Sequence, residues 1–180
     1  MSNQVATQAA STTGNKHASW GGENVAASTD CVQFISFAIG DDQYGVDIMA
    51  VREIKGWSEI THLPKQPDYV RGVLNLRGVI VPIIDLRCRF GQGKTDATVI
   101  HVVIIVQMEQ QLVGLLADRV SDIVSVDPAK IKAVPKVAQS ARLDFLSGIV
   151  TIDDSMIALI ELSHLLTQPE VTPEQKASTH

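Results

Sequence analysis

The residues from Gly91 to Thr95 form the first pattern in the sequence that could carry chemistry. Gly-Gln-Gly-Lys-Thr ends like a phosphate-binding loop, in which backbone N–H groups surround the phosphates and the lysine reaches further oxygens. The first glycine of that pattern would fall on Cys88, however, and the β-branched run that follows predicts a strand instead of the helix that should face the anion. We therefore interpret this segment as a polar, glycine-rich connector.

A hydrolase would need a nucleophile, a base that activates it and a third group that orients the base. The sequence holds five histidines and several carboxylates, but no Gly-x-Ser-x-Gly or His-Glu-x-x-His pattern frames them. Neither Cys31 nor Cys88 has a partner at zinc-ligand spacing. The sequence therefore predicts no enzyme, metal site or cofactor, and turnover that depends on one Cys, His or Asp would overturn this interpretation.

The segment Asn75-Leu76-Arg77-Gly78 is the strongest candidate for recognition of another molecule. Asn and Gly occupy the first and last places that a type I turn favours, so we expect Leu76 and Arg77 at the tip of a hairpin. An apolar residue beside an arginine suits protein recognition, where arginine is enriched. From spacing alone, an ordinary solvated turn is an equal alternative.

Glu53 is a second candidate. A short helix from Ile48 to Ile54, capped by Asp47, would bury Ile48, Val51 and Ile54 and leave Arg52 and Glu53 in solvent. Taken alone, Glu53 is better explained as a solvated charge than as a site, because an exposed ion pair is typically worth only about 0.2–1 kcal/mol.

The composition limits which classes of protein can hold these residues. The chain has 180 residues, of which 45% are hydrophobic and 19% charged, so it can bury a core as one domain or two small subdomains. A net charge of -5 and an aromatic content of 4% argue against a nucleic-acid-binding module, which needs a basic face and stacking aromatics. Because neither a membrane-spanning run nor a signal peptide is visible, we expect a cytoplasmic protein.

The pattern along the chain divides it into three parts. Residues 1–29 and 168–180 are polar and are expected to be flexible tails around a folded domain at 30–167. Within this domain a hairpin is predicted from Phe34 to Ile48, followed by further strands and by two more short helical segments after Asp127 and from Glu161. The further predicted strands cover Val70–Leu76, Val79–Leu86, Val99–Val106, Leu112–Leu116 and Met156–Ile160.

An internal repeat relates the two halves of this domain. Gly45, Val51, Glu53 and Ile54 recur with the same gaps as Gly114, Val120, Asp122 and Ile123, and Gly72–Leu86 matches Gly148–Leu162 over 15 positions without a gap. Apolar alternation explains some of these matches, but it does not explain the coincident glycines and acidic residues. The repeat predicts duplicated subdomains, each a small closed sheet, because closure removes the exposed edges of short strands.

These residues resemble the CheW family, the coupling proteins of bacterial chemotaxis, over about residues 31–166. The Asn-Leu-Arg-Gly-Val-x-x-Pro string that starts at Asn75 is highly specific for this family. The other motifs that carry the resemblance are Phe34–Asp41, Tyr44–Ile48, Val51–Ile54, Gly72–Arg87, Val113-Gly114, Asp118–Ile123 and Leu146–Gly148.

The resemblance implies a fold and a function. The fold would be all-β with short helices, in two intertwined five-stranded SH3-like β-barrel subdomains. Members of the family are adaptors without catalytic activity that join the cytoplasmic tips of chemoreceptors, the methyl-accepting chemotaxis proteins, to the regulatory domain of the histidine kinase CheA. We therefore expect a stand-alone coupling protein that is recruited to membrane-associated receptor arrays, with other CheW copies as further partners and no membrane insertion. The long N-terminal segment leaves open a paralogue that serves another array.

The resemblance also assigns two sets of contact residues. Residues on the receptor side correspond to Val51, Glu53, Gly72 and Arg77, and Glu53 and Arg77 are expected to pair with each other. Residues that meet the kinase or neighbouring barrels correspond to Ile60, Val120, Ile123 and Gly148.

Overall fold

The computed structural model describes residues 31–135 and 144–166, and strands dominate this part of the chain. The tails predicted at 1–29 and 168–180 lie outside the described residues. The strands are β1 (Val32–Ile39), β2 (Asp42–Asp47), β3 (Val51–Gly56), β4 (Val70–Leu76), β5 (Val79–Asp85), β6 (Val102–Met108), β7 (Gln111–Ala117), β8 (Arg119–Val126), β9 (Leu146–Ile152) and β10 (Ser155–Ile160). The short helical elements are η1 (Ile48–Ala50), α1 (Leu86–Arg89), η2 (Pro128–Lys130) and α2 (Leu162–Leu165).

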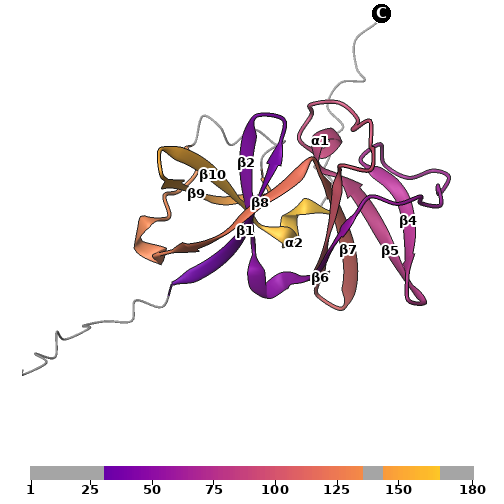
Figure 1. Cartoon of the computed structure of the whole chain (residues 1–180), viewed down its shortest axis with the longest axis horizontal. Coiled ribbons are helices and arrows are strands. Elements are labelled where there is room, and N and C mark those ends of the chain that lie inside the picture. Colours follow the sequence, from indigo (N-terminus) through magenta and orange to yellow (C-terminus); the bar gives the residue numbers. More distant parts are fainter. Residues whose placement is uncertain (1–30, 136–143, 167–180) are drawn as a thin grey trace, which may run out of the picture.

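The strands form two five-stranded sheets that lie side by side (Figure 1). One sheet has the order β8-β1-β2-β10-β9 and is called barrel A here, and the other has the order β3-β6-β7-β5-β4 and is called barrel B. The repeat relates β1 to β6, β2 to β7, β8 to β3, β9 to β4 and β10 to β5, so equivalent strands follow the same order in the two sheets. Barrel A combines the first two strands of the chain with the last three. Each barrel therefore contains strands from both copies of the repeat, and this exchange makes the two barrels intertwined. The expected fold class is therefore confirmed.

Each sheet is closed by a short bridge between the segment after one edge strand and the strand at the opposite edge. After β3, Thr61 and Val73 exchange backbone hydrogen bonds of 2.9 and 2.8 Å, which join the two edges of barrel B. After β8, Lys132 and Ile149 do the same in barrel A, with both bonds at 2.8 Å. Each bridge satisfies the N–H and C=O groups of its two residues, which would otherwise be open to pairing with other chains.

The duplication extends to irregularities of the strands. Val51 pairs with Val106 and Glu53 with Ile105, so Arg52 is an extra, bulged residue in β3. Equivalent β-bulges place one extra residue in β8, β4 and β9. These residues are Ser121, Arg71 and Ser147. Bulges bend a strand and increase its twist, which short strands need in order to close into a small barrel.

Three apolar cores hold the fold together. Barrel B encloses one core around Ile83 and Ile105, and barrel A encloses its equivalent around Val150 and Leu159. The largest core lies between the barrels and draws residues from both, as well as Leu165 of α2. Aromatic rings connect the two barrels within this shared core, with Phe37 near Tyr44, Tyr44 near Phe90 and Phe90 near Phe145 at centroid distances of 6.0, 4.6 and 4.6 Å.

A single residue, Asp118, joins β7 of barrel B to β8 of barrel A. Its Oδ2 accepts a hydrogen bond of 2.7 Å from the backbone N–H of Gly40 in barrel A and also binds the Arg87 guanidinium of α1. Its Oδ1 is buried without a hydrogen-bond partner and lies 3.8 Å from Nε2 of His101. This carboxylate therefore ties the β1–β2 turn to the end of barrel B.

The helix predicted from Ile48 to Ile54 is wrong beyond Ala50. Asp47 does cap a turn, since its Oδ1 accepts from the backbone N–H of Met49 at 2.8 Å, but that turn ends at Ala50 and β3 begins at Val51. The β-branched Val51 and Ile54 have a weak helix propensity, and pairing with β6 satisfies the backbone better. As a result Ile54 is 41% exposed, whereas the sequence pattern predicted it to be buried.

The other predicted elements agree more closely with the structure. The strand predicted at Val70–Leu76 is confirmed, as are the short helical turns after Asp127 and from Glu161, of which the second is α2. The strand predicted from Val99 begins only at Val102, because Val99 and Ile100 form a turn. The strands predicted from the sequence did not include β8 or β9, and α1 was not predicted either.

Gly72 should be one of the positions least tolerant of a side chain. A Cβ atom there would lie 2.3 Å from the carbonyl oxygen of Thr61, and its φ of +145° is one that L side chains rarely adopt. We expect Gly72→Ala to lower the free energy of unfolding by about 1–3 kcal/mol, because the clash is with backbone of the closing bridge. Gly56→Ala, with nothing within 4 Å, is the matched control in the same barrel and should change it by less than about 0.5 kcal/mol. Urea unfolding of both variants measures the difference, and equal effects would contradict the assigned role of the bridge.

Tyr44 should make stability depend on pH in the alkaline range. Burial, assisted by the charge of Asp42, raises the pKa of Tyr44 from 10.0 to about 12. The unfolded chain therefore ionises Tyr44 at a lower pH than the folded protein does. The contribution of Tyr44 to the free energy of unfolding is fully present below pH 10 and is lost as the pH rises to about 12. Urea unfolding at several pH values should show a steeper alkaline loss for the wild type than for Tyr44→Phe. Parallel curves would contradict the burial of the hydroxyl group.

Candidate protein-interaction site

The β4–β5 hairpin places Arg77 at the end of barrel B. Leu76 pairs with Val79, so Arg77 and Gly78 form a two-residue loop, and both have positive φ values, 52° and 89°. Two positive φ values are typical of a type I′ hairpin turn. The sequence predicted the turn one residue too early: Leu76 belongs to β4 and packs against the interior of barrel B.

Asn75 fixes this turn through a side-chain hydrogen bond. Its Oδ1 accepts from the backbone N–H of Gly78 at 2.7 Å. An Asn side chain that bonds to the backbone in this way restricts the turn to few conformations. The hairpin tip is therefore a defined structure in which the Arg77 side chain projects into solvent with 78% of its surface exposed.

The predicted pairing of Glu53 and Arg77 is confirmed as a contact. Nη2 of Arg77 lies 3.0 Å from Oε2 of Glu53, whose side chain is 30% exposed. The two residues come from opposite edges of the sheet, and the closing bridge after β3 is what brings those edges together. An ion pair this exposed contributes little to folding, because solvent screens it.

The backbone at Arg77 shows that the residue is unfavourable for folding. Gly, Asn and Asp are favoured where φ is positive, whereas a long L side chain there costs about 1–2 kcal/mol. An arginine whose ion pair is mostly exposed recovers only part of that cost. Arg77 is therefore held in a conformation whose cost its own ion pair does not offset.

The four residues expected on the receptor side, Val51, Glu53, Gly72 and Arg77, are called the receptor set here. Its other two members, Val51 and Gly72, lie beneath the surface that carries Glu53 and Arg77. Val51 begins β3 and packs against the core shared by the barrels. Gly72 is buried at the bulge of β4, where only a glycine allows β4 to approach Thr61. Among these four residues, Glu53 and Arg77 are therefore the ones that present charged groups at the surface.

The four residues expected on the kinase side, called the kinase set here, are distributed over both barrels. Ile123 on β8 is 54% exposed, and Val120 on the same strand packs against the shared core. Gly148 is buried, and a Cβ there would lie 2.6 Å from Cγ2 of Ile131, so substitution would act by displacing neighbours. Ile60 lies in barrel B, in the segment that closes it, and packs against that barrel's core. The structure brings Val120 and Ile123 together but leaves Ile60 on the other barrel.

The repeat places two members of each set at equivalent positions of the two barrels, since Val51 and Gly72 correspond to Val120 and Gly148. Glu53 corresponds to Asp122, which belongs to neither set. The counterpart of Arg77 is Asp153, whose φ of 46° gives it the same kind of turn. Barrel B therefore carries an acid and a base where barrel A carries two acids, so the two equivalent surfaces differ in charge.

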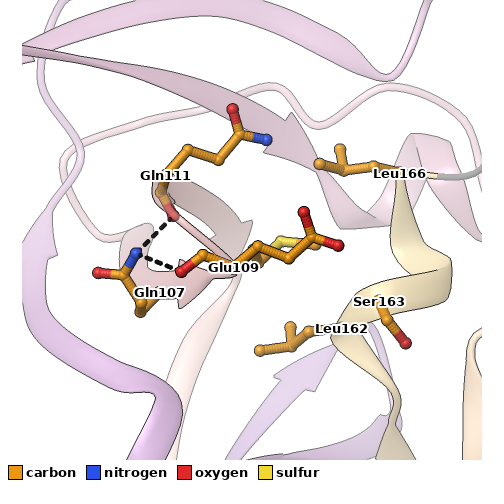
Figure 2. A pocket seen from close by; sticks show the side chains of 7 residues that line it. Gln107, Glu109, Gln111, Leu162, Ser163 and Leu166 are labelled. Atoms are coloured by element: carbon orange, nitrogen blue, oxygen red, sulfur yellow. Dashed lines mark hydrogen bonds between the residues drawn. The ribbon is translucent and has the colours of Figure 1, made fainter.

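A pocket between the barrels is a feature that the sequence did not predict. It has a volume of about 300 Å³ and lies between the β6–β7 turn and α2. Figure 2 shows the Glu109 side chain extending from the turn toward α2, where Leu162 and Leu166 project into the same space. Nε2 of Gln107 donates to the carbonyl oxygens of Glu109 and Gln111 at 3.0 and 3.3 Å, which holds the turn. No sequence signal could reveal this pocket, because it depends on how the barrels meet.

The glycine-rich segment is tied to barrel B and does not resemble a phosphate site. Asp85 is fully buried, and its carboxylate accepts from the N–H and hydroxyl of Thr95 at 2.8 and 2.7 Å and from Arg71 at 3.2 Å. Burial, and to a lesser extent the charge of Asp85, raises the pKa of the Cys88 thiol, which makes it less reactive. The segment leads into strand β6, which confirms that it is a connector.

Two kinds of feature are absent from residues 31–135 and 144–166. No group of three His, Cys, Asp or Glu side chains in these ranges is placed to hold a metal ion. No helix in the same ranges has the length and the apolar character that crossing a membrane requires.

Comparisons with known proteins agree with this geometry. Residues 33–170 match the model of the CheW-like domain. The chain is 45% identical over 138 residues to a probable chemotaxis protein CheW of Rhizobium etli, an alignment that covers 77% of this chain and 89% of the relative. It is 37% identical over 147 residues to a chemotaxis protein CheW of Klebsiella aerogenes, with 82% and 89% covered.

A solved structure supports the same relationship. The crystal structure of the scaffolding protein TtCheW from Thermoanaerobacter tengcongensis superimposes with a TM-score of 0.70 and 35% identity, covering 77% of this chain and 89% of that one. The family model, the relatives and the fold all cover most of the chain. The exchanged barrels and the charged hairpin tip are thus those of a member of the CheW-like domain family, to which this chain belongs.

Proposed function

We propose that this protein is a non-catalytic chemotaxis adaptor that couples transmembrane chemoreceptors to the histidine kinase CheA. The observation that carries the proposal is Arg77, a charged residue held at a positive φ, where it is unfavourable for folding, and exposed beside Glu53. The names of the relatives, chemotaxis and scaffolding proteins, support the same role.

The receptor contact is assigned to barrel B. Glu53 and Arg77 offer a carboxylate and a guanidinium 3.0 Å apart, and a partner that carries both charges can exchange this internal pair for intermolecular ones. Because the internal pair is largely solvated, exchanging it costs little. Val51 and Gly72 set the shape of the same surface. The cytoplasmic tip of a chemoreceptor, a helical hairpin, is the partner that we assign to this surface.

The kinase contact is assigned mainly to barrel A. Ile123 supplies exposed apolar area, and Val120 and Gly148 determine the backbone around it. Ile60 would act from the closing segment of barrel B. The regulatory domain of the kinase, or another copy of this chain, would occupy this surface, and the different charges of the two barrels would keep the two kinds of partner apart.

The mechanism follows from the rigid connection between the barrels. The shared core and the Asp118 contacts fix one barrel relative to the other. A receptor on barrel B and a kinase on barrel A would therefore be held in a defined relative position, and a change in the receptor would reach the kinase as altered contacts. Individual contacts would be modest, and the array, recruited beneath the membrane, would supply effective affinity through multivalency.

Reconstitution of the signalling complex tests this function. Autophosphorylation of the cognate CheA should rise when this protein and receptor-containing membranes are both present, and receptor ligand should reverse the rise. The reactions that lack either this protein or the receptors are the controls. No effect of the folded protein in the complete mixture would contradict the coupling role.

Arg77→Asn separates binding from folding at the hairpin tip. Asn tolerates a positive φ, so the variant should keep the wild-type free energy of unfolding or exceed it by up to about 1 kcal/mol. Its affinity for receptor membranes should fall about tenfold, which is ~1.4 kcal/mol, because the guanidinium is missing. Co-sedimentation measures the affinity and urea unfolding the stability.

The matched control is Arg119→Asn, which removes the same charge from an exposed position on barrel A. This variant should bind receptor membranes as the wild type does. A large loss of stability in Arg77→Asn, or equal loss of binding in both variants, would assign Arg77 a structural role or a general charge effect.

A further inference from the structure

The pocket between the barrels combines one carboxylate with apolar side chains. Met108, Leu162 and Leu166 line it at the rim of the core that the barrels share. The Glu109 side chain extends into the same space from the β6–β7 turn (Figure 2). Within residues 31–135 and 144–166 the Glu109 carboxylate makes no hydrogen bond or ion pair. A carboxylate beside apolar side chains suits a lysine or arginine, whose aliphatic stem packs while its charged end pairs.

The backbone at Glu109 is unfavourable for a glutamate. Met108 pairs with Gln111, so Glu109 and Gln110 form a two-residue loop, and Glu109 has a φ of 50°. The equivalent loop of barrel A has Gly40 at this position, with a φ of 60°. Glycine adopts a positive φ without steric cost, whereas a residue with a Cβ does not. Barrel B therefore has a carboxylate where folding alone favours glycine.

The equivalent place on barrel A contains an arginine of this chain. There, Arg87 of α1 binds the Asp118 carboxylate, which also accepts from the backbone N–H of Gly40 in the β1–β2 turn. The repeat matches α1 to α2, with Ser163 in the place of Arg87. Among the described residues that line the pocket beside α2, Glu109 is acidic and none is basic. The pocket therefore has the acid of such a pair without its base.

The pocket lies at the same end of barrel B as the Arg77 hairpin tip. β5 and β7 are parallel, with Ile83 beside Gly114, so the loops that precede these two strands lie at one end of the barrel. Ile80, which is 60% exposed, and Gln111, which lines the pocket, each lie three residues before that pair. The two loops are two strand spacings apart, about 10 Å, which is close to the width of one helix. A helix that covers Arg77 therefore reaches the pocket.

We propose that this pocket takes a lysine or arginine side chain of the chemoreceptor tip, in the place that Arg87 has beside α1. The inference rests on the proposed function, because it adds a point of recognition to the same contact. The aliphatic stem packs against Leu162 and Leu166, and the charged end pairs with Glu109. A receptor with a neutral or acidic residue there would cover the carboxylate without pairing it, so Glu109 selects among receptors.

Glu109→Gln tests the role of the charge. The amide preserves the length of the side chain and removes the negative charge. We expect the affinity for receptor membranes, measured by co-sedimentation, to fall about tenfold, because a charge-assisted hydrogen bond is replaced by a weaker one. Receptor binding by the variant should also depend less on salt than that of the wild type. Its urea unfolding midpoint and its affinity for CheA should not change.

Asp41→Asn is the matched control, since Asp41 is an exposed acidic residue in the equivalent loop of barrel A. This control should bind receptor membranes as the wild type does, and an equal loss in both variants would overturn the inference. A lower unfolding midpoint of Glu109→Gln with unchanged receptor binding would also overturn it, because the partner of the carboxylate would then be internal. If Glu109→Gln binds as the wild type does while Arg77→Asn binds weakly, the inference fails and the proposed function stands. If the wild type itself does not bind receptor membranes, both fail.

An exchange of charges identifies the partner residue. Each lysine and arginine of the receptor tip is replaced in turn by glutamate, and the membranes are tested with the wild type and with Glu109→Lys. One receptor variant should bind the wild type weakly and regain affinity for Glu109→Lys, because the ion pair is restored with its charges reversed. If no receptor variant regains affinity, the inference is overturned.

Discussion

The parallel pairing of β2 with β10 and of β5 with β7 is the constraint on which the rest of this structure depends. These pairings complete the two sheets, and a glycine lies at each: Gly45 opposite Leu159 and Gly114 opposite Ile83. A Cβ would come within 2.9 Å of Leu159 at Gly45 and within 2.4 Å of Ile83 at Gly114. Both glycines are thus required by packing. Because β10 and β2 come from opposite ends of the domain, their pairing also joins the two separate parts of the chain that make up barrel A.

Much of this architecture was predictable from local pattern. Alternation of apolar residues located most strands, and the coincident glycines and acidic residues were enough to indicate the duplication. The register of the hairpin tip was not predictable in the same way, because Asn75 and Gly78 fit a type I turn equally well and only the pairing of Leu76 with Val79 decides. The helix predicted from Ile48 was too long because the cap at Asp47 stabilises only one turn, and the residues that follow pair with β6 instead.

The candidate site shows the same division between local and non-local information. The family resemblance assigned Glu53 and Arg77, and their contact is observed. The exchange of strands, the pocket beside Leu162 and the exposure of Val99 depend on which distant segments meet, and periodicity carries no information about that. The difference between Arg77 and Asp153 was visible in the sequence, but it acquired meaning only when both were found in equivalent turns.

The strand exchange also has a consequence for synthesis of the protein. The strands of barrel B, β3 to β7, are contiguous in the chain, whereas barrel A needs β1 and β2 together with β8 to β10. During translation barrel B has all its strands first, while β1 and β2 must wait, with apolar residues uncovered, until β10 emerges. Long-range pairing of this kind slows folding and leaves edges open to aggregation. During synthesis the hairpin of β1 and β2 therefore remains without its partner strands for longer than any other part of the fold.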